Sequence, residues 1–392
     1  RSALPKPEQV QVAQKAYEAP SSKAEKAIAD AWQSVLDIEQ VGIHDHFFDL
    51  GGDSIKSLAV VSKVRESGLG INVADLFAYP VLESLAACIQ KQVPQASSKI
   101  MEPFSLCPDS DKTKLPPDVI NAYPISKLQE GMIFHYDSQV SSGSVETKGL
   151  YHNVSRISLD TSIDIAAFKT ALARLVSRHD ILRTSFHMQG FSIPLQLVHQ
   201  QIELPLSYTD LSMFDTKEQQ ELLDLAYTQA LTKRLNVELA PLFSVHVHRL
   251  SSQKSEMTWV EHHALLDGWS VEILFKELSE LYQAELEKRE AQLADTPQYV
   301  NFIAAEQEAI ANSANPQFWR DYLQDAEFAS LPAPDQVSKN KRTSITYSFD
   351  EVFTSALEQL AKQLKVSLKS VALAAHMHVL KTFTGEDDLI TG

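Results

Sequence analysis

The chain has 392 residues, with 51 acidic against 35 basic side chains and a formal net charge of −16 at pH 7. This acidity, without any Lys/Arg-rich run, argues against a nucleic-acid-binding surface. No signal peptide opens the chain, and no apolar run approaches the roughly 18 residues of a membrane-spanning helix. The two cysteines, Cys88 and Cys107, indicate free thiols, so we expect a cytoplasmic protein of two or three globular domains.

The first segments of the chain predict a linker and then a small helical bundle. Residues 1–20 contain prolines and little periodicity, which is typical of a linker. Beyond it, Ala24, Ile28 and Trp32 recur at helical spacing within a helix expected from residue 21 to 36. A further helix is expected from residue 54, then a short helical turn over 73–77 and a closing helix over 81–92. Each has one apolar face, which predicts a four-helix bundle.

A serine at the start of the second helix admits two interpretations. Ser54 follows Gly51 and Gly52, which supply backbone freedom for a turn. As a helix cap, its oxygen would accept bonds from free backbone N–H groups. As an attachment point, it would carry a phosphate that the positive end of the helix attracts. For the glycines and serine alone, the cap is the commoner role.

The residues around Ser54 resemble the signature of the peptidyl carrier (thiolation) domain of nonribosomal peptide synthetases. The matching stretches are Asp45-His46-Phe47-Phe48 and Gly51-Gly52-Asp53-Ser54-Ile55. The resemblance covers residues 21–93 and implies covalent 4'-phosphopantetheine on Ser54, added by a phosphopantetheinyl transferase. Asp53 would orient the arm or face a partner enzyme. Gly51 and Gly52 would let partner enzymes approach the backbone closely, because they carry no side chain. Phe47 and Phe48 would pin the loop to the bundle.

A proline-rich linker is expected over 94–119, and an α/β unit follows it. Strands are expected over 151–159 and 243–250, and amphipathic helices over 165–177 and 269–287. A second round of elements is expected near the end: an extended segment over 344–349, helices over 351–364 and 367–383, and a strand at Leu389-Ile390.

Two adjacent histidines stand at the chemical centre of this unit. His262 and His263 lie between a strand expected over 257–260 and the helix that Trp269 opens. Neighbouring strand residues point to opposite faces, so one imidazole faces a shared cavity while the other packs. Imidazole can orient an attacking amine or accept its proton. The histidine pair alone does not exclude a structural role for both residues.

A metal site is the weaker interpretation of the other histidines. His246 and His248 share one strand face, whereas His376 and His378 lie on different sides of a helix. Metal sites usually add a third ligand at motif spacing, so no metal is expected.

The stretch from His262 to Gly268 matches His-His-x-x-x-Asp-Gly, and the unit therefore resembles the condensation domain of the chloramphenicol-acetyltransferase-like superfamily. Residues 123–132 and 178–186 resemble its first two motifs. The resemblance implies an α/β fold of two lobes, the first over 120–295 and the second over 296–392. It also implies an incomplete second lobe, because later strands and the crossover segment are missing.

The resemblance further implies a peptide-bond-forming acyltransferase, of the kind that builds antibiotics or siderophores. His263 would position or deprotonate the acceptor amine, with His262 as a structural neighbour. Asp267 would be structural and pair with Arg183. Gly268 would allow the substrate or the backbone to approach closely at the tunnel in which the two reactants meet. Ser54 would present the donor aminoacyl or peptidyl thioester, because the carrier precedes the condensation domain. An upstream adenylation domain and a downstream aminoacyl carrier are the other implied partners.

Several alternatives remain at this point. Epimerization domains share the fold, but their motif places Ser before Trp, whereas this chain has Trp269-Ser270. A non-catalytic recruiting domain would have lost parts of the histidine motif, and a coenzyme A dependent acyltransferase would need no attached carrier. An inert interaction module would be insensitive to replacement of His263. The substrates, the product and the donor stereochemistry stay open.

Overall fold

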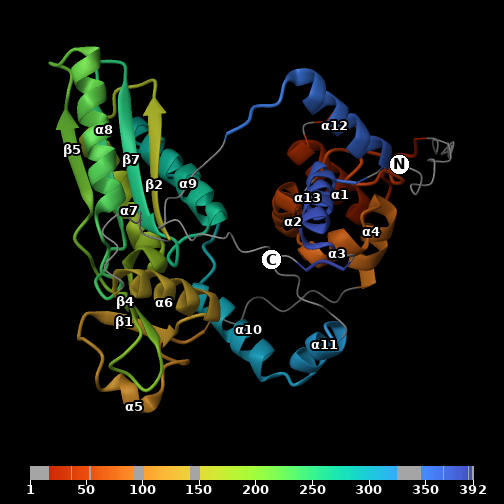
Figure 1. Cartoon of the computed structure of the whole chain (residues 1–392), viewed down its shortest axis with the longest axis horizontal. Helices are drawn as coiled ribbons and strands as arrows, with labels where there is room; N and C mark the ends of the chain where they lie inside the picture. Colours follow the sequence, from red (N-terminus) through yellow and green to blue (C-terminus); the bar gives the residue numbers. More distant parts are fainter. Residues whose placement is uncertain are drawn as a thin grey trace. The chain divides into compact units, whose positions relative to one another are not determined.

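The computed structural model describes residues 17–36, 38–52, 54–91, 101–141, 151–324, 346–364, 366–386 and 388–390. The chain divides into two compact units, residues 1–98 with 319–392, and residues 99–318. Figure 1 shows helices in the first unit and both sheets and helices in the second. In the described ranges, no helix has the length and apolarity needed to cross a membrane.

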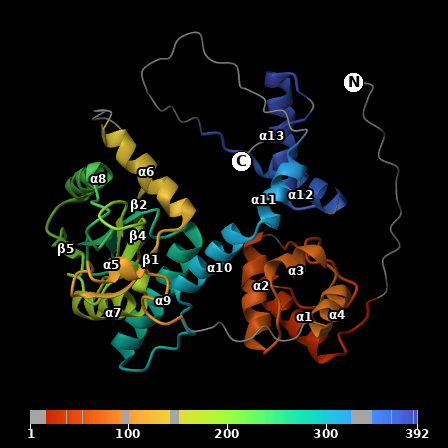
Figure 2. The ribbon, with the colours of Figure 1, turned by 90° about the horizontal axis from the view of Figure 1, so that it is seen from below.

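The N-terminal part of the chain folds as the predicted four-helix bundle. Ala24, Ile28 and Trp32 are buried together, as their spacing predicts. The Ser22 hydroxyl accepts a bond from the Glu25 N–H at 3.1 Å, while the Glu25 carboxylate accepts one from the Ser22 N–H at 2.8 Å; this reciprocal cap fixes the start of the first helix. Figure 2 shows the four helices together: α1 (Lys23–Leu36), α2 (Ser54–Glu66), α3 (Val73–Ala78) and α4 (Leu82–Lys91).

Two sheets form the frame of the second unit. A three-stranded sheet has the order β1-β4-β3, and a four-stranded sheet has the order β2-β7-β6-β5. All neighbouring strands are antiparallel except β5 and β6, which are parallel. The strands are β1 (Val119–Pro124), β2 (His152–Leu159), β3 (Thr184–His187), β4 (Leu195–His199), β5 (Leu206–Asp210), β6 (Phe243–Arg249) and β7 (Ser255–His262).

The helices of this unit are interspersed with the strands along the chain, although β3, β4 and β5 follow one another directly, as do β6 and β7. The expected helices over 165–177 and 269–287 correspond to α7 and α9. The helices are α5 (Asp109–Lys112), α6 (Lys127–Ser141), α7 (Ile165–Arg178), the 3-10 helix Asp180–Arg183, α8 (Thr216–Thr232), α9 (Gly268–Glu287), α10 (Tyr299–Ala311) and α11 (Ala314–Tyr322), the last of which continues into the other unit.

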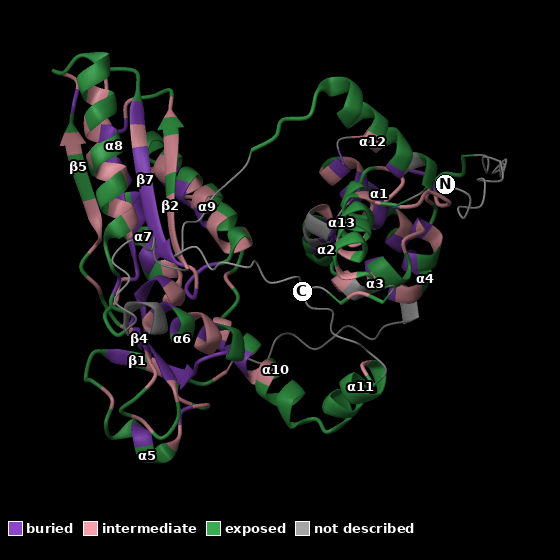
Figure 3. Ribbon diagram, viewed as in Figure 1, coloured by how far each residue is buried: buried purple, intermediate pink, exposed green. Residues whose placement is uncertain are grey.

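The main core lies between the larger sheet and helices α7 and α9. Met257 and Trp259 of β7 point to the same side as Phe243 of β6, and all three are buried with Leu274 and Leu278 of α9. The Trp259 and Phe243 rings stack with centroids 5.3 Å apart. Figure 3 shows β7 buried along almost its whole length. The strand that leads to the histidine pair is therefore held on both edges and on this face.

Residues 101–118 differ from the predicted linker. They contain α5, and Phe104, Cys107 and Leu115 pack with β1 and β4. Asp111 is buried and accepts bonds from the backbone N–H of Ser192, at 2.8 Å, and from its hydroxyl. Prolines interrupt the apolar periodicity of this segment, so its packing could not be predicted from the sequence. Burial raises the pKa of the Cys107 thiol.

The last two helices match their predicted ranges closely. They are α12 (Glu351–Leu364) and α13 (Leu368–Thr384), with Ser367 as the N-cap of the second. The predicted extended segment over 344–349 lies partly outside the described residues, and its described part, 346–349, forms no strand. Residues 389 and 390 also form no strand, because no neighbouring strand is present in the described chain to pair with them.

Candidate functional site

The loop before Ser54 is fixed by one buried ring. Phe47 is fully buried, with its ring centroid 5.1 Å from that of Trp32, so it pins the loop as predicted. The Gly52 N–H donates to the Phe47 carbonyl at 3.0 Å. A Cβ on Gly52 would lie 2.4 Å from the Phe47 ring, whereas Gly51 has open space but a φ of +90°. Gly52 is therefore needed for internal packing, a role beyond the close approach of partners expected for it.

Helix α2 begins at Ser54, as predicted. The first turn of α2 contains no acidic residue and includes Lys56, which suits a phosphate at the positive helix end. This local charge fits attachment of a phosphopantetheine arm. Asp53, the other residue predicted for cofactor binding, lies outside the described residues.

The histidine pair lies where the inner strand β7 ends. His262 is the last residue of this strand and is fully buried. Its Nδ1 accepts a bond from the Ala264 N–H at 3.1 Å, and its ring meets the Tyr136 ring edge to face at 4.6 Å. Burial, and next the neighbouring His152 and His263, lower the pKa of His262 to about 4. It is a neutral packing residue, in keeping with the structural role predicted for it.

His263 is the first residue of the turn that follows β7, and it is half-exposed. Its backbone N–H donates to the Tyr151 carbonyl at 2.7 Å, and the two rings stack with centroids 6.4 Å apart. Its Nδ1 lies 3.2 Å from Nδ2 of Asn153. Among the described residues, this is the one hydrogen-bond partner of the ring, so Nε2 is the nitrogen left to face a substrate.

Asp267 and Gly268 form the start of α9. The Asp267 carboxylate accepts bonds from the Ser270 N–H at 2.8 Å and from the Ser270 hydroxyl at 2.7 Å. Gly268 is exposed, and a Cβ there would meet no atom within 4 Å. Internal packing therefore does not require this glycine. This leaves room for an outside group, as its predicted role needs.

The predicted pairing of Asp267 with Arg183 is wrong in this structure. Arg183 is buried and binds Asp180 at 2.6 Å together with the backbone carbonyls of Val176 and His199. Asp267 is exposed and serves as a helix cap. Local partners explain the difference: Asp180 lies three residues before Arg183, and an aspartate is a preferred N-cap.

The first motif is tied directly to the histidine turn. Gln129 is buried, and its side-chain N–H donates to the Ala264 carbonyl at 2.9 Å. Its carbonyl oxygen accepts bonds from the Ser126 N–H and from Gln196. The sequence located this glutamine within a motif but gave it no contact. The structure also places Asn153 beside His263 and opposite Glu261 in the strand pair, and no motif pointed to either role.

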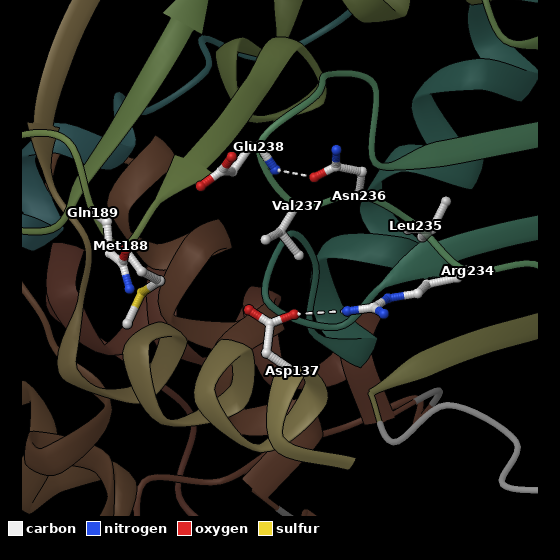
Figure 4. A pocket seen from close by; sticks show the side chains of 8 residues that line it. All are labelled: Asp137, Met188, Gln189, Arg234, Leu235, Asn236, Val237 and Glu238. Carbon is white, nitrogen blue, oxygen red and sulfur yellow. Dashed lines mark hydrogen bonds and ion pairs between the residues drawn. The ribbon is translucent and has the colours of Figure 1, made fainter. Parts of the chain in front are cut away.

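Two cavities lie near the site without including the histidine pair. One, of about 560 Å³, is lined by residues of α6, the loop after β3 and residues 234–238. Figure 4 shows its polar lining, with Asp137 and Arg234 paired at 3.2 Å. The other, of about 740 Å³, lies between α8 and the sheet, where His246, Thr258 and Val260 line it. The second cavity thus occupies the sheet face opposite the main core.

The remaining histidines of β6 form a stacked pair. The rings of His246 and His248 lie with centroids 3.9 Å apart. Burial lowers the pKa of both, and that of His248 to about 4. In the part of the chain that the structure describes, no three His, Cys, Asp or Glu side chains are grouped to hold a metal ion.

Comparison with known proteins separates the two parts of the chain. Residues 26–89 match the phosphopantetheine attachment site family, and residues 119–392 match the condensation domain family. AMB antimetabolite synthetase AmbE of Pseudomonas aeruginosa is 30% identical over 97% of this chain and 18% of its own length. Tyrocidine synthase 2 of Brevibacillus parabrevis is 30% identical over 100% of this chain and 10% of its own length. The chain therefore spans less than a fifth of either relative.

Solved structures show the same fold at lower identity. The SgcC5 protein from Streptomyces globisporus has a TM-score of 0.53 and 23% identity, covering 68% of this chain and 61% of that one. The first condensation domain of the CDA synthetase has a TM-score of 0.53 and 19% identity, covering 68% and 62%.

The bundle and the histidine-bearing sheet together define a phosphopantetheine carrier followed by an α/β domain of the chloramphenicol-acetyltransferase-like fold. The chain belongs to the condensation domain family and, with the carrier in front, is similar to nonribosomal peptide synthetases.

Proposed function

We propose that this chain takes part in one step of nonribosomal peptide synthesis, in the cytoplasm, by joining a donor acyl group to the amine of a downstream aminoacyl carrier. The order of its two domains carries this proposal: the attachment domain over 26–89 precedes the condensation domain over 119–392. Ser54 is the proposed attachment residue, and its upstream place makes it the donor side. A bound phosphopantetheine arm supplies a flexible thiol that carries the acyl group as a thioester.

His263 is the residue proposed to act on the amine. Asn153 engages its Nδ1, so Nε2 faces the reacting groups from a half-exposed turn. In the reaction, the amine nitrogen forms a bond to the acyl carbon, the carbon–sulfur bond breaks to release the donor arm as a thiolate, and the proton that the amine gives up ends on that sulfur. Nε2 would orient the amine or receive this proton, while the two tethered reactants meet at high effective concentration.

The proposed domain boundaries follow from the resemblance, although residues 101–118 of the connection contain α5 and pack with β1 and β4. They are a linker over 1–20, the carrier over 21–93, a connection over 94–119, a first lobe over 120–295 and part of a second lobe over 296–392. The proposed partners are a phosphopantetheinyl transferase, an upstream adenylation domain and a downstream carrier. Substrate side chains and the peptide product are not assigned.

The carrier proposal is tested by intact mass after incubation with coenzyme A and a broad phosphopantetheinyl transferase. We expect one added arm on the chain and none on the Ser54→Ala variant. A folded chain that gains no arm would remove the carrier function.

The role of His263 is tested in a synthetase that contains this chain and a downstream carrier. We expect His263→Ala to lower the rate of peptide formation by about 100-fold or more, the usual scale of lost proton transfer or orientation. His246→Ala, which changes a half-buried histidine of β6, is the matched control and should keep the rate. Unchanged peptide formation in His263→Ala would favour an inert interaction module.

A further inference from the structure

A carboxyl group is buried beside the proposed catalytic histidine. Glu261 is 3% exposed and lies in β7 opposite Asn153 of β2 and Phe243 of β6. Its Oε2 has no hydrogen-bond partner among the described residues. Burial raises the pKa of this carboxyl to about 7, and the side chains of Asn153 and Trp259 oppose part of that rise. A carboxyl in an apolar setting destabilises a fold, so packing alone does not explain it.

Asn153 connects this carboxyl to the imidazole. Alternation along the strands puts Asn153 and Glu261 on the face where Trp259 and the main core lie. Side chains directly opposite one another in an antiparallel pair are close neighbours. The Asn153 Nδ2 also lies 3.2 Å from Nδ1 of His263. The Asn153 amide therefore lies beside His263 and across the strand pair from Glu261.

We propose that Asn153 and Glu261 are positioning residues that set the tautomer of His263, and thereby decide whether Nε2 offers a lone pair or a proton to the substrate. The inference rests on the proposed function of His263, and it adds two residues to that site. Neither residue touches the substrate. Each acts through the imidazole.

Two hydrogen-bond arrangements follow from the chemistry of the three groups. An ionised Glu261 can only accept hydrogen bonds, so the amide N–H groups of Asn153 face both Glu261 and His263. The Nδ1 of His263 then accepts a bond, and the proton of the neutral ring lies on Nε2. A protonated Glu261 donates, so the amide oxygen of Asn153 faces both neighbours and accepts from Glu261 and from Nδ1–H. Only this second arrangement leaves a lone pair on Nε2 for the amine.

The surroundings leave Glu261 as the group whose titration sets the balance near neutrality. His152 and His262 lie on the opposite sheet face, and burial lowers the pKa of both, that of His262 to about 4. The ring of Tyr151 stacks on His263 itself. The charged residues near the start of α9, which covers the Glu261 side, are exposed: Asp267, Glu272 and Lys276.

The tautomer of His263 can be measured on this chain without any substrate. We would label the histidines with ¹⁵N, assign His263 by the signals that His263→Gln loses, and record imidazole ¹⁵N shifts at pH 8.5. At this pH the Glu261 carboxyl is mainly ionised. We expect the wild type to carry its proton on Nε2.

Two variants should move that proton to Nδ1. Glu261→Gln keeps the size but cannot ionise, and its amide N–H can donate to the Asn153 oxygen. The ratio of tautomers should shift by about tenfold, the effect of one exchanged hydrogen bond. Asn153→Asp places an oxygen that only accepts next to Nδ1, and should shift the ratio in the same direction if Glu261→Gln does not fold. Glu256→Gln is the matched control, because it lies on the same strand and pairs with Arg156 instead.

The outcomes separate this inference from the proposed function. Folded Glu261→Gln and Asn153→Asp variants that keep the wild-type tautomer would overturn it, and so would an equal shift in Glu256→Gln. If His263→Ala abolishes peptide formation while the tautomer never moves, the proposed function stands and the inference fails. If the tautomer moves but His263→Ala keeps its activity, the hydrogen-bond relay stands and the function of His263 fails.

Discussion

At the scale of single residues, the two glycines before Ser54 have different tasks. Gly51 adopts a φ of +90° in open space, whereas a Cβ on Gly52 would lie 2.4 Å from the Phe47 ring and 2.6 Å from its carbonyl oxygen. Neither Phe47 group can give way, because the ring is fully buried against Trp32. The backbone at Gly51 favours glycine through its dihedral angle alone.

This difference predicts unequal costs for the same substitution. Gly52→Ala should destabilise the carrier by about 2 kcal/mol or more, through overpacking. Gly51→Ala should cost about 1 kcal/mol, through the positive φ. Thermal unfolding of the carrier and its loading with phosphopantetheine measure both effects. Equal losses in the two variants would contradict the assigned contact between Gly52 and Phe47.

The buried histidines predict a stability that falls with acid. The folded pKa of His248 is about 4, whereas an unfolded imidazole titrates near pH 6.5. Between these values the unfolded chain binds more protons, so the stability present above pH 6.5 is lost as the pH falls toward 4. His262 adds a loss of the same sign.

Replacing one buried histidine should weaken this dependence. Between pH 7 and 4.5, His248→Gln should lose about 2 kcal/mol less than the wild type, because its side chain does not titrate. Calorimetry at both values resolves the transition of the sheet unit. His376→Gln, which changes an exposed histidine of α13, should leave the dependence as it is. A wild-type slope in His248→Gln would contradict the burial argument.

At the scale of elements, the sequence predicts long periodic segments better than short ones. The ranges of α7, α9, α12 and α13 follow the apolar spacing of their residues to within one or two positions. The four-residue helix α5 and the short strands β3 and β4 carry too few residues for a period. Their packing depends on contacts between distant segments, such as that of Asp111 with Ser192.

The candidate site shows the same limit. The motif located His262, His263 and Asp267, because these residues are close in sequence. Their environments depend on pairing between strands: Asn153 meets Glu261 only through the register of β2 with β7. A one-residue change of that register would turn Asn153 to the other face. The sequence therefore indicated the histidine that acts but not the residues that orient it.

At the scale of the whole chain, the carrier has a core of its own. All buried residues of this core lie between Ala24 and Ile89, and those packed against it lie within the same range. Two helix caps that the structure describes in this region are also internal, from Ser22 with Glu25 and from Asn72 with Asp75. A domain whose core is complete is expected to fold alone.

Residues 17–91 should therefore fold and be loaded without the rest of the chain. We expect the isolated segment to unfold cooperatively and to gain one phosphopantetheine arm at a rate within about twofold of that of the whole chain, because the described residues of its core all lie inside it. Far-UV circular dichroism and a time course of intact mass test this. Trp32→Ala is the control, because it leaves a cavity in the core of the carrier. A segment that stays unfolded, or is loaded only when residues 99–392 are joined to it, would show that the carrier needs the other domain.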